Sequence, residues 1–544
     1  MTGNRKTFIR PSINIFGNIQ PGYILWLLPL VASGLYINLG LLPLKGDEAI
    51  RAEVALEMML SGNYITPTLT GELYLNKPPL YNWILIGFFR LFQNNSEFMV
   101  RFPTTLFLLL YCIIIFYWVR KELGKQIALM SSLAFFTCGR ILFWDSYLGL
   151  IDIFFSGLTF LNFMLIWHLY RKRKFFRLFV ISYLLTAFCF LLKGLPALVF
   201  QGFALLVIFL QHKNYKGLIS WKHLTGILIL LFLTGTYYFL YSIQNPGYVD
   251  DALMRLVTES THKSAIGSTI QKTILHFFTF PLEVIQHFLP WILLTPFLFY
   301  RKIFNRILKT PFIRYCFLIF MANIVIYWLS PTTYPRYLLM LMPLLFLVCL
   351  YSARYHIMLK TLQFYIVQGI LVVFVTGLIF SSTLLPALFR QSLEVDHFWL
   401  KLLAVVLISI TAVVWKRKSP KAGLLFFTAI VLLISRLSFD LFLMPYRESH
   451  DLLSQCRKDA IELADKTKGQ PLFYMTDTIT MHNVYYITRE RDEILTFNGN
   501  PAAGPWFIVD DTLKAGAAFK KEIAMKVPYQ NKTFYAGKFS EPGP

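Results

Sequence analysis

The sequence predicts an all-α protein that crosses a membrane many times and ends in a small soluble α/β domain. Hydrophobic residues make up 56% of the 544 residues, and the mean hydropathy is +0.55. They gather in blocks of about 17 to 22 residues, the length of a helix that spans a bilayer core. Beyond residue 445 such blocks give way to short apolar runs between polar stretches.

The apolar windows predict about thirteen membrane-spanning helices. The first is long for a signal-peptide core, and no small-residue cleavage site follows it, so we expect it to be retained. Lys193 and Gly194 separate two of the helices, which could instead form one broken element. The windows lie near 23–43, 102–119, 126–144, 150–169, 177–192, 195–211, 224–243, 282–299, 312–329, 336–351, 363–384, 400–415 and 423–443.

The positions of the charges predict the orientation. The net charge is +23, but Lys and Arg cluster in short loops such as 171–174 and 416–418. This is the pattern of cytoplasmic loops rather than of a nucleic-acid surface, so nucleic acid is excluded as a partner. With the basic N-terminus inside, an odd number of spans puts the C-terminus outside. We therefore expect a multi-pass protein of the bacterial inner membrane that contacts membrane lipids.

Two domains follow from this topology. Residues 1–444 form the membrane domain, with periplasmic loops at 45–101 and 244–280, and residues 445–544 form a soluble periplasmic domain. In the first loop, 49–60 has a helical pattern, and 80–92 is an apolar helix too short to span, expected at the interface. In the tail we expect a helix near 449–467 and strands at 472–475, 484–487 and 506–509. His482 is interpreted as an ordinary surface histidine.

The first outward loop, 46–79, holds the strongest candidates for chemistry. Asp47 and Glu48 follow directly on the first predicted helix, and Lys77 precedes two prolines that fix the backbone at the membrane surface. A carboxylate there can deprotonate or orient an acceptor hydroxyl or amine. A cation can hold a lipid phosphate as its charge develops. The same charges could instead only solvate the loop. Candidate substrate contacts are Arg51, Tyr74 and Tyr81.

Further candidates lie downstream. Arg255, Glu259 and His262 fall at helical spacing and would share one face, which could bind substrate or be a solvated surface. Asp152 lies in or near a predicted span, where an unpaired carboxylate costs free energy. Lys193 could pair with it for a structural role, or either residue could serve the site. No metal-type or disulfide-type cysteine spacing is present in the sequence.

The loop resembles the first periplasmic loop of the bacterial aminoarabinose transferase and protein O-mannosyltransferase superfamily, which are C-type membrane glycosyltransferases. The likeness rests on the Asp47-Glu48 pair, Ala52-Glu53, the turn at 61–64 and the KPPL motif at 77–80. Downstream, the break at 191–196, the motif at 335–338 and the acidic position at 152 are also similar. The resemblance covers roughly residues 20–445 and leaves the tail without a motif.

This resemblance implies the GT-C fold and the transfer, with inversion, of a sugar from a polyprenyl phosphate such as undecaprenyl phosphate. The acceptor could be lipid A, another envelope glycan or a protein. Some aminoarabinose transferases have an acidic residue before the KPP lysine that helps to bind a metal. This chain has Asn76, so no cofactor is certain and a divalent metal stays open. By the resemblance, the catalytic candidates are Asp47, Glu48 and Asp152, and the phosphate-binding candidates are Lys77, Arg255, Arg336 and Lys193.

Two other functions remain as alternatives. A transporter or flippase of a lipid-linked glycan would more often carry broken helices and charges near the bilayer midplane. A scaffold that kept the fold would not need Asp47. Arg336 could likewise be only an interfacial anchor. The ionisable residues gather at the outer ends of the predicted helices, which favours the transferase.

Overall fold

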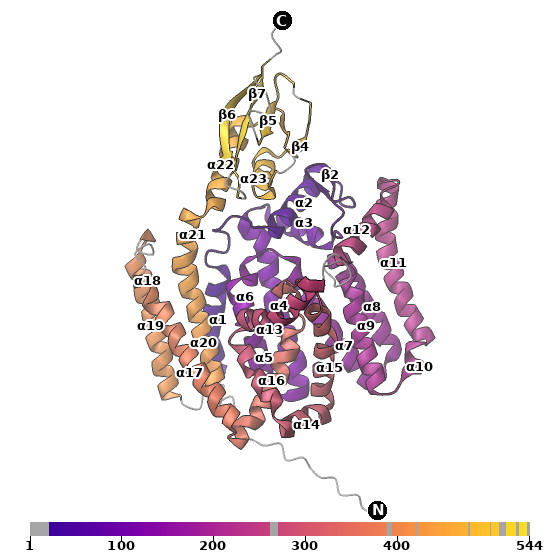
Figure 1. Cartoon of the computed structure of the whole chain (residues 1–544), viewed down its shortest axis with the longest axis vertical. Helices are drawn as coiled ribbons and strands as arrows, with labels where there is room; N and C mark the ends of the chain where they lie inside the picture. Colours follow the sequence, from indigo (N-terminus) through magenta and orange to yellow (C-terminus); the bar gives the residue numbers. More distant parts are fainter. Residues whose placement is uncertain are drawn as a thin grey trace, which may run out of the picture.

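The structure, a computed structural model, describes residues 21–261, 270–388, 394–419, 423–476, 479–500, 502–510, 518–528 and 532–540. Its long helices form a bundle, and the C-terminal domain stands on one end of it (Figure 1). We call this end of the bundle the domain end. The basic segments around α10 (Tyr215–Leu218) and α14 (Arg301–Lys309) lie at the opposite end.

The predicted all-α multi-pass architecture is confirmed. Among the described residues, nine helices are long and apolar enough to cross a membrane, or up to ten if one bent pair counts as a single span. The predicted count of thirteen is not confirmed. The bent pair is α5 (Lys125–Phe136) with α6 (Gly139–Phe143) and the turn η1 (Asp145–Tyr147). The nine are α4 (Glu97–Leu123), α7 (Ile151–Arg171), α8 (Phe175–Lys193), α10 with α11 (Trp221–Gln244), α15 (Pro311–Trp328), α16 (Met342–Leu359), α17 (Leu362–Thr383), α19 (Phe398–Lys418), and α20 (Leu424–Ser438) with η6 (Phe439–Leu443) and α21 (Met444–His450).

Some expected spans are broken or short. The prediction of one helix at 282–299 is wrong, because α13 (Ile270–Phe288) ends before Pro290 and a 3-10 segment, η3 (Trp291–Phe299), follows. Proline lacks the N–H that would continue a helix. Gly194, with φ of +81°, separates α8 from the shorter α9 (Pro196–Gln211). The other short helices of the bundle are α1 (Pro21–Tyr36), α12 (Val249–Thr261) and α18 (Leu385–Leu388).

The first loop folds into two helices joined by a small hairpin, and both predicted helices are confirmed. α2 (Asp47–Ser61) begins with two acidic residues, which its N-terminal dipole favours, and ends at Gly62 in the left-handed conformation. The hairpin pairs β1 (Thr68–Leu69) with β2 (Glu72–Leu73). The double proline then leads into α3 (Leu80–Phe92). The loop therefore reaches the domain end as ordered structure.

The tail forms a five-stranded sheet with two helices. The strand order is β4-β3-β5-β7-β6, with parallel pairs around β3 and antiparallel pairs around β7. The predicted strand at 484–487 is wrong, because these residues belong to the helix α23. The helix expected near 449–467 appears as α22. The elements are α22 (Leu452–Thr467), β3 (Leu472–Tyr474), α23 (Met481–Arg491), β4 (Thr496–Phe497), β5 (Trp506–Val509), β6 (Phe519–Lys526) and β7 (Thr533–Phe539).

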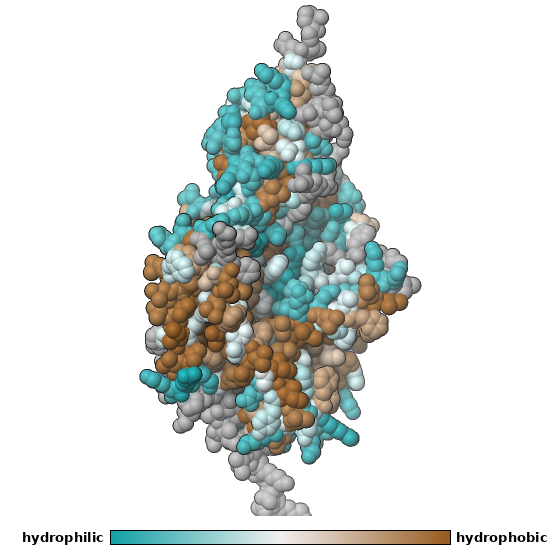
Figure 2. All heavy atoms as spheres, turned by 60° about the vertical axis from the view of Figure 1, so that its left-hand side comes forward, coloured by the Kyte–Doolittle hydropathy of each residue, from teal (hydrophilic) through white to brown (hydrophobic). Residues whose placement is uncertain are grey.

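The core of the tail is continuous with the core of the bundle. One buried apolar cluster extends from the bundle through α2 and α23 to the sheet. In Figure 2, hydrophobic side chains dominate the bundle below the domain, and hydrophilic ones dominate the domain itself. The tail is therefore packed onto the first loop as part of one folded structure.

Candidate functional site

Four charged side chains from four distant segments meet at the domain end. Arg336, in the turn η4 (Pro335–Leu338), donates through Nη2 to the carboxylate of Asp47. Its Nε lies 3.5 Å from Oδ2 of Asp152. The Nζ of Lys193 lies 2.5 Å from Oδ1 of Asp152. We call Asp47, Arg336, Asp152 and Lys193 the charge chain. The structure thus brings four predicted site residues together.

The local structure explains why these charges are held here. Asp152 lies in the first turn of α7 and Lys193 is the last residue of α8, so each sits where the helix dipole favours its charge. Three members of the chain are mostly buried, whereas the side chain of Asp47 is 52% exposed. Asp47 is therefore the member that an incoming molecule can reach most easily.

Arg336 is the centre of this arrangement. Burial acts to lower the pKa of its guanidinium, but the carboxylates of Asp152 and Asp47 outweigh burial and raise the pKa above its ordinary value. Tyr337, which the sequence reading missed, places its ring 3.9 Å from the Nζ of Lys193. The motif at 335–338 contains Tyr337, but nothing local in the sequence indicates its contact with Lys193. At this site two mostly buried cations are thus paired with two carboxylates.

The lysine of the KPP motif approaches the same place. Lys77 is half-buried and is close enough to Asp152 to interact with it electrostatically. The preceding Asn76 accepts a hydrogen bond of 2.8 Å from Nε of Arg255. Arg255 also lies 3.9 Å from Glu259 along α12. Helix α12 therefore contacts the residue that precedes the KPP motif. His262 lies outside the described residues.

Glu48 lies away from the charge chain although it is the neighbour of Asp47. Its carboxylate is fully buried and accepts from Nη2 of Arg101 at 2.8 Å and from Nε at 3.2 Å. The backbone N–H groups of Lys45 and Gly149 also donate to it, at 2.7 and 2.8 Å. With its acceptor positions occupied, Glu48 holds the start of α2 in place rather than facing a substrate.

The predicted substrate contacts in the loop are also buried. Arg51 donates to the hydroxyl of Tyr74, and the guanidinium lies 4.9 Å from the ring centroid. Tyr81 is fully buried, with its hydroxyl 3.1 Å from Oγ1 of Thr104. Tyr74 and Lys77 line a small pocket of about 260 Å³ beside three tyrosines of α11. Of these candidates, Tyr74 is the one that borders an opening.

The donor set around Asp47 does not suit a divalent metal. Among the described residues, no group of three or more His, Cys, Asp and Glu side chains could hold such an ion. The two carboxylates of the charge chain face Arg336 and Lys193, and Asn76 binds Arg255. The carboxylates of the charge chain thus pair with cations of the protein and do not converge as a set of metal ligands.

His482 is a further residue of this region, and the interpretation as a surface histidine is wrong. Its side chain is 5% exposed, and its Nε2 lies 3.0 Å from the backbone N of Gly46, the residue before Asp47. Burial lowers the pKa of His482 to about 4, with Glu48 opposing and Lys45 assisting the shift. The imidazole is therefore neutral at pH 7 and accepts the hydrogen bond from Gly46.

Acidification is expected to weaken this contact. Because the pKa is about 4 in the folded state and about 6.5 in the unfolded chain, the stabilisation is complete above pH 6.5. Stability should fall with decreasing pH between these values, by at most about 1.4 kcal/mol per pH unit. Burial raises the pKa of Glu53 and Glu57, whose protonation acts in the opposite sense. Thermal unfolding of the wild type and of His482→Gln between pH 7 and 4 measures the contribution of the histidine. Only the wild type should lose the stability that depends on neutral His482.

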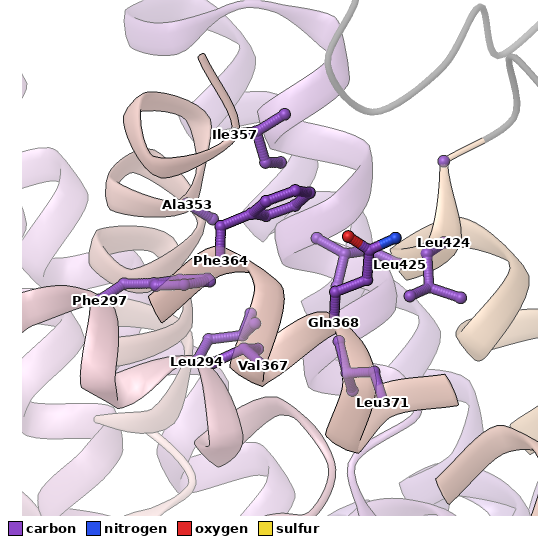
Figure 3. Close-up of a pocket in the computed structure, with 11 residues that line it drawn as sticks. Leu294, Phe297, Ala353, Ile357, Phe364, Val367, Gln368, Leu371, Leu424 and Leu425 are labelled. Atoms are coloured by element: carbon purple, nitrogen blue, oxygen red, sulfur yellow. The ribbon is translucent and has the colours of Figure 1, made fainter. Parts of the chain in front are cut away.

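A separate pocket of about 630 Å³ lies between η3, α16, α17 and α20 (Figure 3). The described residues that line it are apolar apart from Gln368 on α17. None of the predicted site residues is among them, so this pocket does not belong to the charge chain.

Comparison with known proteins supports the resemblance seen in the sequence. Residues 76–239 match the family described as dolichyl-phosphate-mannose-protein mannosyltransferase. An uncharacterized protein of Aquifex aeolicus (strain VF5) is 24% identical over 310 residues, which are 56% of this chain and 59% of that protein. The match thus spans about three fifths of the length of this relative.

Two solved structures match nearly the whole chain. ArnT from Cupriavidus metallidurans bound to undecaprenyl phosphate has a TM-score of 0.69 at 18% identity, covering 96% of this chain and 99% of that one. The apo form of the same protein has a TM-score of 0.68 at 18% identity, with coverage of 95% and 98%. Such similarity extends through the C-terminal domain, for which the sequence offered no motif. The protein therefore has the GT-C fold of these ArnT structures, and its residues 76–239 match the mannosyltransferase family.

Proposed function

We propose that the protein is a glycosyltransferase that moves a sugar from a polyprenyl phosphate to an acceptor at the outer face of the bacterial inner membrane. The observation that carries this proposal is the charge chain, in which an exposed carboxylate is held against a buried arginine at the domain end. An aspartate beside a fixed cation supplies what the reaction needs, a proton acceptor and a phosphate site. The basic segments at the opposite end support an orientation with the tail in the periplasm.

The donor phosphate is assigned to Arg336, with Lys77 and Lys193 beside it and Arg255 at the KPP motif. A guanidinium can form two parallel hydrogen bonds to phosphate, and the nearby ammonium groups add charge. The Cupriavidus protein that shares the fold has been solved with undecaprenyl phosphate, which supports the same lipid carrier here. The donor would enter sideways from the membrane, with its phosphate at the domain end.

The reaction is a single displacement. The acceptor oxygen or nitrogen attacks the anomeric carbon of the sugar and forms the new bond to it. The bond between this carbon and the phosphate oxygen breaks, and polyprenyl phosphate leaves with the electron pair. Asp47 accepts the proton of the acceptor, and Arg336 and its neighbours stabilise the charge that develops on the phosphate. Attack from the face opposite the leaving group inverts the anomeric centre.

Donor binding is expected to depend on Arg336. In the purified protein in lipid nanodiscs, Arg336→Gln should weaken binding of undecaprenyl phosphate by about ten- to hundredfold, because a charge-assisted hydrogen bond is lost. Arg90→Gln is the control, since Arg90 is an exposed arginine of the first loop that contacts Tyr64 and lies outside the charge chain. Equal binding by wild type and Arg336→Gln would show that the charge chain is not the donor site.

The acceptor can be found in cells. Lipids, envelope glycans and secreted proteins of strains with and without the gene are compared by mass spectrometry. The proposal predicts that one sugar is missing from one of these classes in the deletion strain. The wild-type gene should restore it and Asp47→Asn should not. Identical profiles in all strains would contradict a transferase.

A further inference from the structure

Helix α23 of the C-terminal domain packs against α2, the helix that begins at Asp47. Three side chains of α23 reach across to the first loop. Nε2 of His482 accepts from the backbone N–H of Gly46 at 3.0 Å, and the hydroxyl of Tyr486 accepts from that of Leu44 at 2.9 Å. Thr488 donates to Oε1 of Glu53 at 2.7 Å. The residues joined by these three contacts are 436, 442 and 435 positions apart in the sequence.

The backbone just before Asp47 is fixed by side chains at every N–H group. Three consecutive residues donate to three different acceptors, two of which belong to the tail. The pairs are Leu44 with Tyr486 Oη, Lys45 with Glu48 Oε1 at 2.7 Å, and Gly46 with His482 Nε2. The direction of the Asp47 side chain follows from the orientation of this short segment.

Gly46 is the point at which this direction can change. Its φ of 58° and ψ of −124° lie in a region that favours glycine, and glycine has many other conformations available. The hydrogen bond to His482 selects one of them. By accepting from the N–H of Gly46, His482 therefore restricts the backbone of the residue that precedes Asp47.

The tail is anchored firmly enough to act on the loop. Glu97, at the start of α4, forms ion pairs with Nη1 of Arg457 at 2.9 Å and with Nη1 of Arg489 at 3.2 Å. Nη1 of Arg457 also donates to the carbonyl of Leu41 at 3.2 Å. The hydroxyl of Tyr474 donates to Oγ1 of Thr70 in the hairpin at 3.0 Å. α23 is thus held between its own sheet and the membrane domain.

We infer that the C-terminal domain is part of the transfer machinery, and that His482, supported by Tyr486, is a positioning residue that aims Asp47 at Arg336. The inference rests on the proposed function, in which Asp47 receives the proton of the acceptor. His482 acts on Asp47 through the backbone of Gly46.

The test compares three variants of the full-length protein. His482→Phe removes the acceptor, whereas His482→Gln keeps an oxygen near the position of Nε2. His450→Phe is the control, because His450 is a more exposed histidine of α21 that pairs with Glu394. For His482→Phe we expect kcat to fall by about ten- to hundredfold, as misaimed catalytic groups do, with little change in KM for the donor. His482→Gln should recover most of the rate, and His450→Phe should match the wild type.

Hydrogen–deuterium exchange supplies a readout that does not need activity. His482→Phe should raise exchange in the segment 44–48, while α22 and β5 exchange as in the wild type. Full activity of His482→Phe, equal losses in His482→Phe and His482→Gln, or faster exchange throughout the tail would each overturn the inference. If the wild type itself transfers no sugar from any polyprenyl-phosphate donor, the proposed function fails, and the exchange at 44–48 alone decides whether His482 positions the loop.

Discussion

Replacing Asp47 by asparagine is expected to lower the transfer rate by about 10²- to 10⁴-fold, the usual contribution of a general base. Asparagine has the same shape and can still accept a hydrogen bond from Arg336, but it cannot take up a proton at neutral pH. The donor should therefore bind almost as it does in the wild type. Steady-state kinetics with a polyprenyl-phosphate sugar separates the effect on catalysis from the effect on donor binding, since kcat should fall and KM should hardly change.

Glu72→Gln is the matched control for this experiment. Glu72 is an exposed carboxylate of the same loop, in the strand β2. It should keep the wild-type rate, because its charge lies on the surface of the hairpin. An Asp47→Asn enzyme with the full rate would exclude Asp47 as the proton acceptor and would leave Asp152 as the remaining carboxylate of the charge chain.

Replacing Arg101 by methionine is expected to destabilise the protein by about 3 to 5 kcal/mol, because it leaves the buried carboxylate of Glu48 without its cation. Arg101 also donates to the carbonyls of Leu39 and Leu42 at 2.8 Å and to that of Pro43 at 2.9 Å. Without Arg101, the whole segment that leads into α2 would therefore lose hydrogen bonds. Unfolding in a graded detergent mixture measures the change in free energy.

The control for this variant comes from the same helix. Arg120→Met changes an exposed arginine near the other end of α4 and should leave the unfolding free energy almost unchanged. A loss below about 1 kcal/mol in Arg101→Met would contradict a stabilising role of the Arg101–Glu48 pair at the start of α2. The double variant with Glu48→Gln would then be as stable as the single one.

Asp47 and Glu48 illustrate how far the sequence could predict the site. The adjacent carboxylates look equivalent in the chain, and both were expected to serve catalysis. Consecutive residues of a helix point about 100° apart, so only one of them can face the opening while the other faces the interior. Which one does so depends on Arg101 and Gly149, and nothing local in the sequence identifies those partners.

The tail shows why other features were missed. The run at 484–487 is rich in β-branched and aromatic residues, a composition that predicts a strand. α23 is buried between α22 and α2 on nearly all sides, so it lacks the polar face that marks a surface helix. His482 lies on this helix, so its burial cannot be read from the sequence for the same reason. The spans, by contrast, were largely predictable, because apolar length is a property of each segment alone.

The contact between His482 and Gly46 also has a consequence for biosynthesis. The two residues are 436 positions apart, which at typical translation speeds corresponds to roughly 20 to 90 s. In the proposed topology, the first loop leaves the ribosome early and waits outside the membrane until α23 has been made, exported and folded. A newly inserted chain is thus expected to reach its full transfer rate only when its distal segment closes onto its beginning.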